Sequence, residues 1–148
     1  MESSEYGLPV VVLTVLVVDD RSMARRIASR ILSEEGFRVL EADGMGEALE
    51  VLAQARGRLD LVMLDVVMGD GDGVKLARQI QEEWPDQRVL FMSGFAAEVL
   101  ARYGLKELDV PFLAKPFTRN ELLAKVRETL QRLSPEQMRT RAETKRNG

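Results

Sequence analysis

Four short apolar runs constrain what this chain can fold into more than any other feature. They lie at residues 15–18, 61–64, 89–92 and 112–114, and a weaker fifth run lies at 38–41. None of the four alternates between apolar and polar residues, which is typical of strands that helices cover on both faces. A sheet built from these runs should therefore be parallel.

The segments between the runs have the periodicity of amphipathic helices, with apolar residues three and four positions apart. Gly36 and Gly57 stand where two helices should stop, because glycine adopts the left-handed conformation that closes a helix at little cost. Thr118 and Glu121 form a capping-box pattern before the last helix. We expect strands near 15–18, 37–42, 60–64, 88–92 and 110–114, and helices near 22–35, 45–56, 74–84, 96–103 and 118–133. This alternation predicts an α/β fold with a doubly wound parallel sheet and right-handed crossovers.

Length and composition narrow the class of protein. A chain of 148 residues holds one such domain, so we expect an N-terminal extension at 1–12, the domain at 13–133 and a basic tail or linker at 134–148. Cysteine and histidine are both absent, which excludes thiolate and imidazole chemistry and fits a reducing compartment such as the cytoplasm. The net charge of −3 argues against direct nucleic-acid binding, and the apolar run at 10–18 is too short for membrane insertion.

Polar side chains follow the strands at one edge of the predicted sheet, where open parallel sheets bind their ligands. Asp19 and Asp20 follow the first strand, Asp65 the third, Ser93 the fourth and Lys115 the fifth. Singly, each has an ordinary explanation as a helix cap, a turn residue or a surface charge. Three neighbouring aspartates repel one another, however, and a divalent cation relieves that repulsion. Oxygen ligands alone favour Mg²⁺, with Mn²⁺ tolerated.

Four motifs resemble the receiver domain of response regulators in two-component signalling and phosphorelays. They are Val-Leu-Val-Val-Asp-Asp at 15–20, Leu-Asp-Val-Val-Met at 64–68 with Asp72-Gly73, Phe-Met-Ser-Gly at 91–94, and Lys-Pro-Phe at 115–117. The resemblance covers residues 13–133 with the strand ends in order. It implies a flavodoxin-like (βα)5 fold with strand order 2-1-3-4-5.

The resemblance also implies a role for each site residue. Asp65 would accept a phosphoryl group from a phosphohistidine, so that the domain catalyses its own phosphorylation and dephosphorylation without being a conventional enzyme. Mg²⁺ would be bound by Asp19, Asp20, Asp65 and the backbone carbonyl of Val67. Ser93 and Lys115 would contact phosphoryl oxygens, and Ser93 would act with Phe112 as the switch. An ordinary core role is the competing reading of Phe112.

The implied donor is a sensor histidine kinase or a histidine phosphotransfer protein. A downstream protein would read the surface made by the helix near 96–103, the strand near 110–114 and the helix near 118–133, and a homodimer is a further candidate. Phe-Met-Ser-Gly-Phe and Phe-Leu-Ala-Lys-Pro-Phe-Thr also resemble receivers that terminate hybrid histidine kinases. The chain is then either a domain of a larger kinase or a stand-alone regulator.

Two positions depart from the family's commoner choices. Gly69 stands where many receivers have proline, which should loosen the loop at 66–73. Val67, two residues after Asp65, cannot orient an attacking water by hydrogen bonding, so this position alone does not fix the lifetime of the phosphoryl group.

Three other functions remain open. A haloacid-dehalogenase-like phosphatase also uses a nucleophilic aspartate and Mg²⁺, but its Asp-x-Asp spacing differs from Asp19-Asp20-Arg21. A receiver-like interaction module without phosphorylation would not need every site position. A flavodoxin-like cofactor domain usually has a phosphate loop rich in Ser, Thr and Gly, whereas paired aspartates repel phosphate.

Overall fold

The computed structural model describes residues 11–69, 72–94 and 111–132 of the chain. Its strands are β1 (Thr14–Val18), β2 (Arg38–Ala42), β3 (Leu61–Asp65), β4 (Val89–Ser93) and β5 (Phe112–Ala114). Its helices are α1 (Ser22–Glu34), α2 (Met45–Gln54), α3 (Asp72–Glu83) and α5 (Arg119–Gln131). Each bound lies within about two residues of the predicted one, which is the usual uncertainty of element ends. The helix predicted near 96–103 lies outside the described residues.

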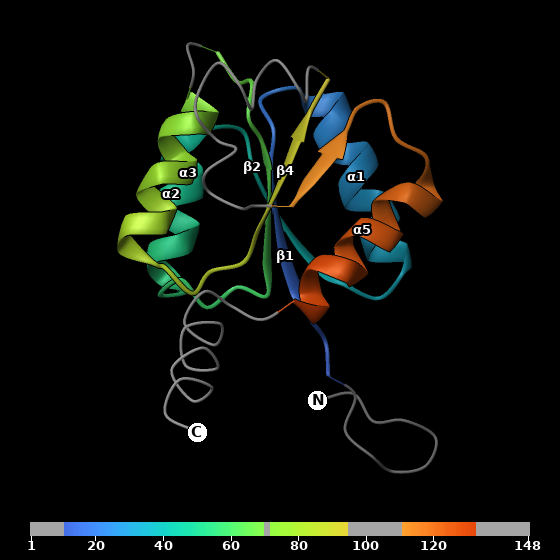
Figure 1. Ribbon diagram of the computed structural model, residues 1–148, viewed down its shortest axis with the longest axis horizontal. Helices are drawn as coiled ribbons and strands as arrows, with labels where there is room; N and C mark the ends of the chain where they lie inside the picture. Colours follow the sequence, from blue (N-terminus) through green and yellow to red (C-terminus); the bar gives the residue numbers. More distant parts are fainter. Residues whose placement is uncertain (1–10, 70–71, 95–110, 133–148) are drawn as a thin grey trace, which may run out of the picture.

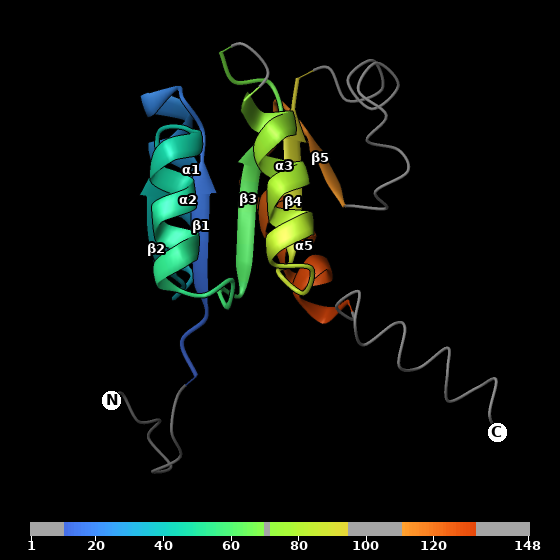
Figure 2. The same ribbon diagram turned by 90° about the vertical axis from the view of Figure 1, so that its left-hand side faces the viewer.

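The five strands form one parallel sheet in the order β2-β1-β3-β4-β5, as predicted (Figure 2). The chain steps outward from β1 to β2 and then crosses back to β3 on the other side of β1. Strand order therefore reverses between β1 and β3, and such a reversal leaves a crevice at the carboxyl ends of the two strands. The register pairs Val18 with Leu64, so Asp19 and Asp65 emerge side by side at that crevice.

Helices cover both faces of the sheet and create two cores (Figure 1). Helices α2 and α3 pack on one face against residues such as Leu16 and Leu64, while α1 and α5 pack on the other against Val17 and Met63. Successive strand residues point to opposite faces, which is why the strand runs are apolar throughout. No helix among the described residues is long and apolar enough to cross a bilayer.

The helix ends follow the predicted local chemistry. Glu121 N donates to Thr118 Oγ1 at 3.1 Å and Thr118 N donates to Glu121 Oε1 at 3.1 Å, which confirms the capping box of α5. Gly57 follows α2 with φ of 65°, and a Cβ there would collide with the ring of Trp84. Glycine at this position therefore both turns the chain and admits the tryptophan against the α2–α3 side of the core.

Candidate functional site

The crevice at the strand ends is a solvent-open cleft of about 510 Å³. Asp19, Asp65, Ser93 and Lys115 supply its polar lining, and side chains that include Val67 supply its apolar walls. Asp65 is only 4% exposed, and Asp19 and Ser93 are 1% exposed each. The sequence therefore predicted correctly that these four side chains converge, although each comes from the end of a different strand.

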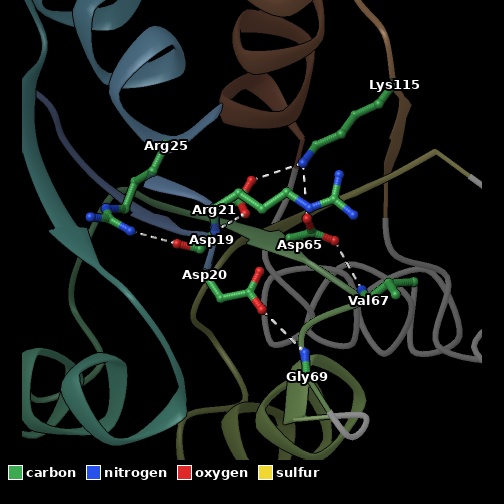
Figure 3. A network of polar contacts seen from close by, with 8 residues as sticks. All are labelled: Asp19, Asp20, Arg21, Arg25, Asp65, Val67, Gly69 and Lys115. Atoms are coloured by element: carbon green, nitrogen blue, oxygen red, sulfur yellow. Dashed lines mark hydrogen bonds and ion pairs between the residues drawn. The ribbon is translucent and has the colours of Figure 1, made fainter. Parts of the chain in front are cut away.

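Lys115 joins the two buried carboxylates across the sheet. Its Nζ lies 2.8 Å from Asp19 Oδ2 and 2.9 Å from Asp65 Oδ2, so one ammonium group donates to both acids (Figure 3). Charge-assisted hydrogen bonds of this length are about twice as strong as neutral ones. Two carboxylates nevertheless share one cation, so this part of the cleft keeps an excess of negative charge.

Backbone amides fix the remaining positions of the three acids. Asp65 Oδ1 accepts from Val67 N at 2.9 Å, and Asp19 Oδ1 accepts from Arg21 N at 2.9 Å. Asp20 is exposed, and its Oδ2 accepts from Gly69 N at 3.2 Å. The carboxylate of Asp20 does not cap α1, because the N-cap position is Arg21 and carries no side-chain cap bond.

Burial and charge act in opposite directions on the ion pairs. Burial raises the pKa of Asp65, and although the hydrogen bond and charge of Lys115 and the amide of Val67 lower it, burial prevails with help from the nearby Asp19 carboxylate. Burial alone would lower the pKa of Lys115, but its bonds to Asp19 and Asp65 outweigh that effect and raise it. Lys115 thus stays protonated, whereas burial disfavours the ionised form of Asp65.

The donor set at the cleft fits Mg²⁺ chemically. Three carboxylates and the backbone carbonyl of Val67 are hard oxygen ligands, and one carboxylate oxygen of Asp20 makes no hydrogen bond or ion pair with the described part of the chain. Within the described ranges, however, no three acidic residues are already grouped as a metal cage. Lys115 rather than an ion bridges Asp19 and Asp65 in this arrangement, so binding a metal would require these side chains to rearrange.

The two predicted switch residues occupy adjacent strands. Ser93 ends β4 inside the cleft, and its carbonyl accepts from Lys115 N at 2.9 Å. Phe112 begins β5, is half-buried and packs against the α2–α3 side of the core, where it pairs in register with Phe91. Phe112 is thus neither a fully buried core residue nor a free surface side chain.

Gly69 has a role that the sequence did not suggest. Its φ of 45° lies in the left-handed region, and its N–H makes the bond to Asp20 described above. Proline has no N–H and a fixed negative φ, so it could form neither feature. The loop after Asp65 is thereby tied to the end of β1 at Gly69, where looseness was expected; residues 70–71 lie outside the described part of the chain.

Sequence reasoning missed one arginine in the cleft and a second that holds the end of β1. Arg25 Nη1 donates to the carbonyl of Asp19 at 2.8 Å, and its Nε pairs with Glu41 at 3.1 Å, which anchors the end of β1 to β2. Arg21 lines the cleft itself. No sequence signal marked Arg21, because it precedes the predicted helix and arginine is not a typical cap residue.

The family model of the response regulator receiver domain matches residues 15–127. Sensor kinase CckA of Brucella abortus is 37% identical over 119 residues, which cover 80% of this chain and 13% of CckA. Response regulator receiver protein CpdR of the same organism is 31% identical over 116 residues, which cover 78% of this chain and 95% of CpdR. The crystal structure of the NtrX receiver domain from Brucella abortus superposes with a TM-score of 0.71 at 28% identity, covering 79% of this chain and 98% of that domain.

The chain spans a small fraction of CckA and nearly all of CpdR, so the matching region is part of a much longer protein in one relative and almost the whole protein in the other. The family match covers most of the chain and includes the ends of β1, β3, β4 and β5 with their acids, serine and lysine. This chain belongs to the response regulator receiver domain family.

Proposed function

We propose that Asp65 is the phosphoacceptor of this receiver domain and that its phosphorylation depends on Mg²⁺. The observation that carries the proposal is the bridge from Lys115 to Asp65 and Asp19 inside an open cleft. Asp65 is the buried acid at the end of β3, and burial raises its pKa, a kind of shift that is common among carboxylates at functional sites.

The proposed reaction needs an ionised Asp65 and positive charge around the phosphoryl oxygens. An oxygen of Asp65 forms a bond to phosphorus as the P–N bond of a phosphohistidine breaks, and the imidazole leaves with the electron pair and takes a proton from solvent. Mg²⁺ held by Asp19, Asp20, Asp65 and the Val67 carbonyl would supply charge that neutralises the phosphoryl oxygens. Lys115 favours the ionised form of Asp65 beforehand and is placed to pair with a phosphoryl oxygen afterwards, and buried Ser93 is placed to donate to another.

A change at Asp65 would leave the cleft through Ser93 and Phe112. A phosphoryl group adds about −1.5 to −2 units of charge and strong acceptor oxygens, which favours drawing Ser93 toward Asp65. Ser93 and Phe112 lie on neighbouring strands, and Phe112 is half-buried, so an inward turn of its ring would bury it further. The partner that reads the change would bind the face containing β5 and α5, and the donor would be a histidine kinase or phosphotransfer protein in the cytoplasm, where ATP supplies the kinase.

Intact-mass spectrometry tests the acceptor. The protein is incubated with acetyl phosphate and Mg²⁺, and we expect one added phosphoryl group in the parent protein and none in Asp65→Asn. Asp60→Asn is the matched control, because Asp60 accepts from Thr14 N at 2.7 Å at the opposite edge of the sheet. Equal labelling of Asp65→Asn and the parent would show that another residue is the acceptor.

A further inference from the structure

Arg21 is held by its backbone while its side chain is free. Its N–H donates to Asp19 Oδ1 at 2.9 Å, and its carbonyl accepts from Arg25 N at 3.0 Å. The side chain is exposed, lines the cleft with Asp65 and Lys115, and points across the cleft from the end of β1 (Figure 3). Its guanidinium makes no hydrogen bond or ion pair with any residue of the described ranges.

Arginine is a poor residue for this position if only stability matters. Arg21 occupies the N-cap of α1, where Ser, Asp or Asn would satisfy a free backbone N–H, and no side-chain cap bond is present. A positive charge at a helix N-terminus also opposes the helix dipole, and the first turn of α1 contains no acid to compensate. A residue that breaks a local rule in this way is expected mainly at a functional site.

The charge of the cleft explains what an unpaired arginine could do there. Lys115, which is partly buried, already pairs with both Asp19 and Asp65, so an approaching phosphate meets an excess of negative charge among the described residues of the cluster. The guanidinium of Arg21 is the charge at the cleft that remains uncommitted among the described residues. Its planar fork matches two oxygens of a phosphoryl group.

We propose that Arg21 is a positioning residue that binds phosphoryl oxygens of the incoming anionic phosphodonor. The inference rests on the proposed phosphorylation of Asp65. With acetyl phosphate, an oxygen of Asp65 bonds to phosphorus while the P–O bond to the acetyl group breaks and acetate leaves with the electron pair. Arg21 neither gives nor takes a proton in this step; it offsets the repulsion between the donor and the carboxylates and orients phosphorus toward Asp65.

The steady-state rate of phosphoryl turnover, measured over a range of acetyl phosphate concentrations at saturating Mg²⁺, tests the proposal. We expect Arg21→Gln to raise the KM for acetyl phosphate about fivefold with little change in kcat, which corresponds to one exposed charge contact. Arg26→Gln is the matched control, because it removes the same charge from an exposed residue of α1 that does not line the cleft. Arg21→Lys should recover part of the affinity, since it restores the charge without the fork.

Two further readouts separate this role from a structural one. Arg21→Asn should raise Tm by about 3 °C because it supplies the missing cap, whereas a stabilising arginine would give a loss. Arg21→Gln should bind Mg²⁺ about twofold more tightly by calorimetry, because a like charge has been removed beside the acids.

An unchanged KM in Arg21→Gln, or an equal increase in Arg26→Gln, would overturn the inference while phosphorylation of Asp65 still stood. Absence of any labelling in the parent protein would overturn both the proposed function and this inference. A fall in Tm for Arg21→Asn would also contradict it, because the arginine would then be stabilising α1.

Discussion

Replacing Lys115 with methionine tests the charge balance of the cleft. Methionine keeps much of the length of the side chain but removes the ammonium that bridges Asp19 and Asp65 at 2.8 and 2.9 Å. The two acid side chains are only 2% and 6% exposed, so the variant leaves two neighbouring carboxylates buried without a cation. Removing one partner of a buried ion pair typically costs about 3–5 kcal/mol.

The structure places the expected loss at the lower end of that range. The Lys115 side chain is 19% exposed, so water partly screens the interaction, and protonation of one carboxylate in the variant limits the repulsion. We expect a loss of about 3 kcal/mol in the free energy of unfolding at pH 7 in EDTA, a large share of the roughly 5–15 kcal/mol of a typical domain. The loss should shrink at lower pH, where the variant takes up a proton, and on adding Mg²⁺, which stabilises the folded state by mass action.

Urea unfolding measures this loss. Circular dichroism and the fluorescence of Trp84, the only tryptophan of the chain, monitor the transition. Lys125→Met is the control on α5: its partner Glu128 lies 3.5 Å away and is 61% exposed, so we expect a change within about 0.5 kcal/mol. Adding Asp65→Asn to Lys115→Met should recover part of the loss, because one buried charge disappears. Equal stability of Lys115→Met and the parent in EDTA at pH 7 would refute the reasoning.

Three further predictions concern single residues of the same edge of the sheet. Burial raises the pKa of Asp65 above its ordinary value of 3.8, so the protonated carboxyl favours folding below that pH, and this contribution is lost as pH rises through the folded-state pKa. Asp65→Asn should therefore gain stability relative to the metal-free parent between pH 4 and 7. A difference in urea unfolding that stays constant over that range would count against this prediction. Val67 is 42% exposed in the cleft, so Val67→Asn, which can hydrogen-bond an attacking water, should speed loss of the phosphoryl group about 2- to 10-fold in a decay assay, and an unchanged lifetime would rule out this role. A Cβ at Gly73 would collide with the carbonyls of Asp65 and Val66, so Gly73→Ala should lower the free energy of unfolding by about 1–3 kcal/mol. Gly46 lies inside α2 with open space around it, so Gly46→Ala should leave that free energy unchanged or raise it by up to about 1 kcal/mol. Equal effects of the two variants in thermal unfolding would contradict the packing.

The sequence predicted the sheet because four of the five strands are apolar on both faces, a pattern typical of strands that helices cover on both sides. Residue type at the strand ends then predicted the convergence of Asp19, Asp65, Ser93 and Lys115, since parallel strands deliver their carboxyl ends to one edge. The pairing within the cluster did not follow from sequence: Lys115 was expected beside a phosphoryl group, and no spacing rule indicates that it also bridges two acids across the sheet.

Backbone features near the site were the least predictable. Gly69 differs from the family's common proline, and only three-dimensional structure reveals that its N–H reaches Asp20, which lies far away in sequence. Gly73 belonged to a recognised motif, but the sequence did not indicate why glycine is required there. The start of α3 lies so close to the backbone of Asp65 and Val66 that a Cβ at position 73 would collide with it. Arg21 is unremarkable in sequence because helix caps are weak signals, and its meaning depends on the charges that face it.

Site-specific trapping of the phosphoryl group tests the central claim most directly. The protein is treated with acetyl phosphate and Mg²⁺ and then with borohydride, which reduces an aspartyl phosphate to homoserine, and the peptides are sequenced by mass spectrometry. The account predicts homoserine at position 65, dependent on Mg²⁺, with Asp19, Asp20 and Asp60 unchanged. Homoserine at another aspartate, or a borohydride-insensitive adduct with Asp65 intact, would contradict it.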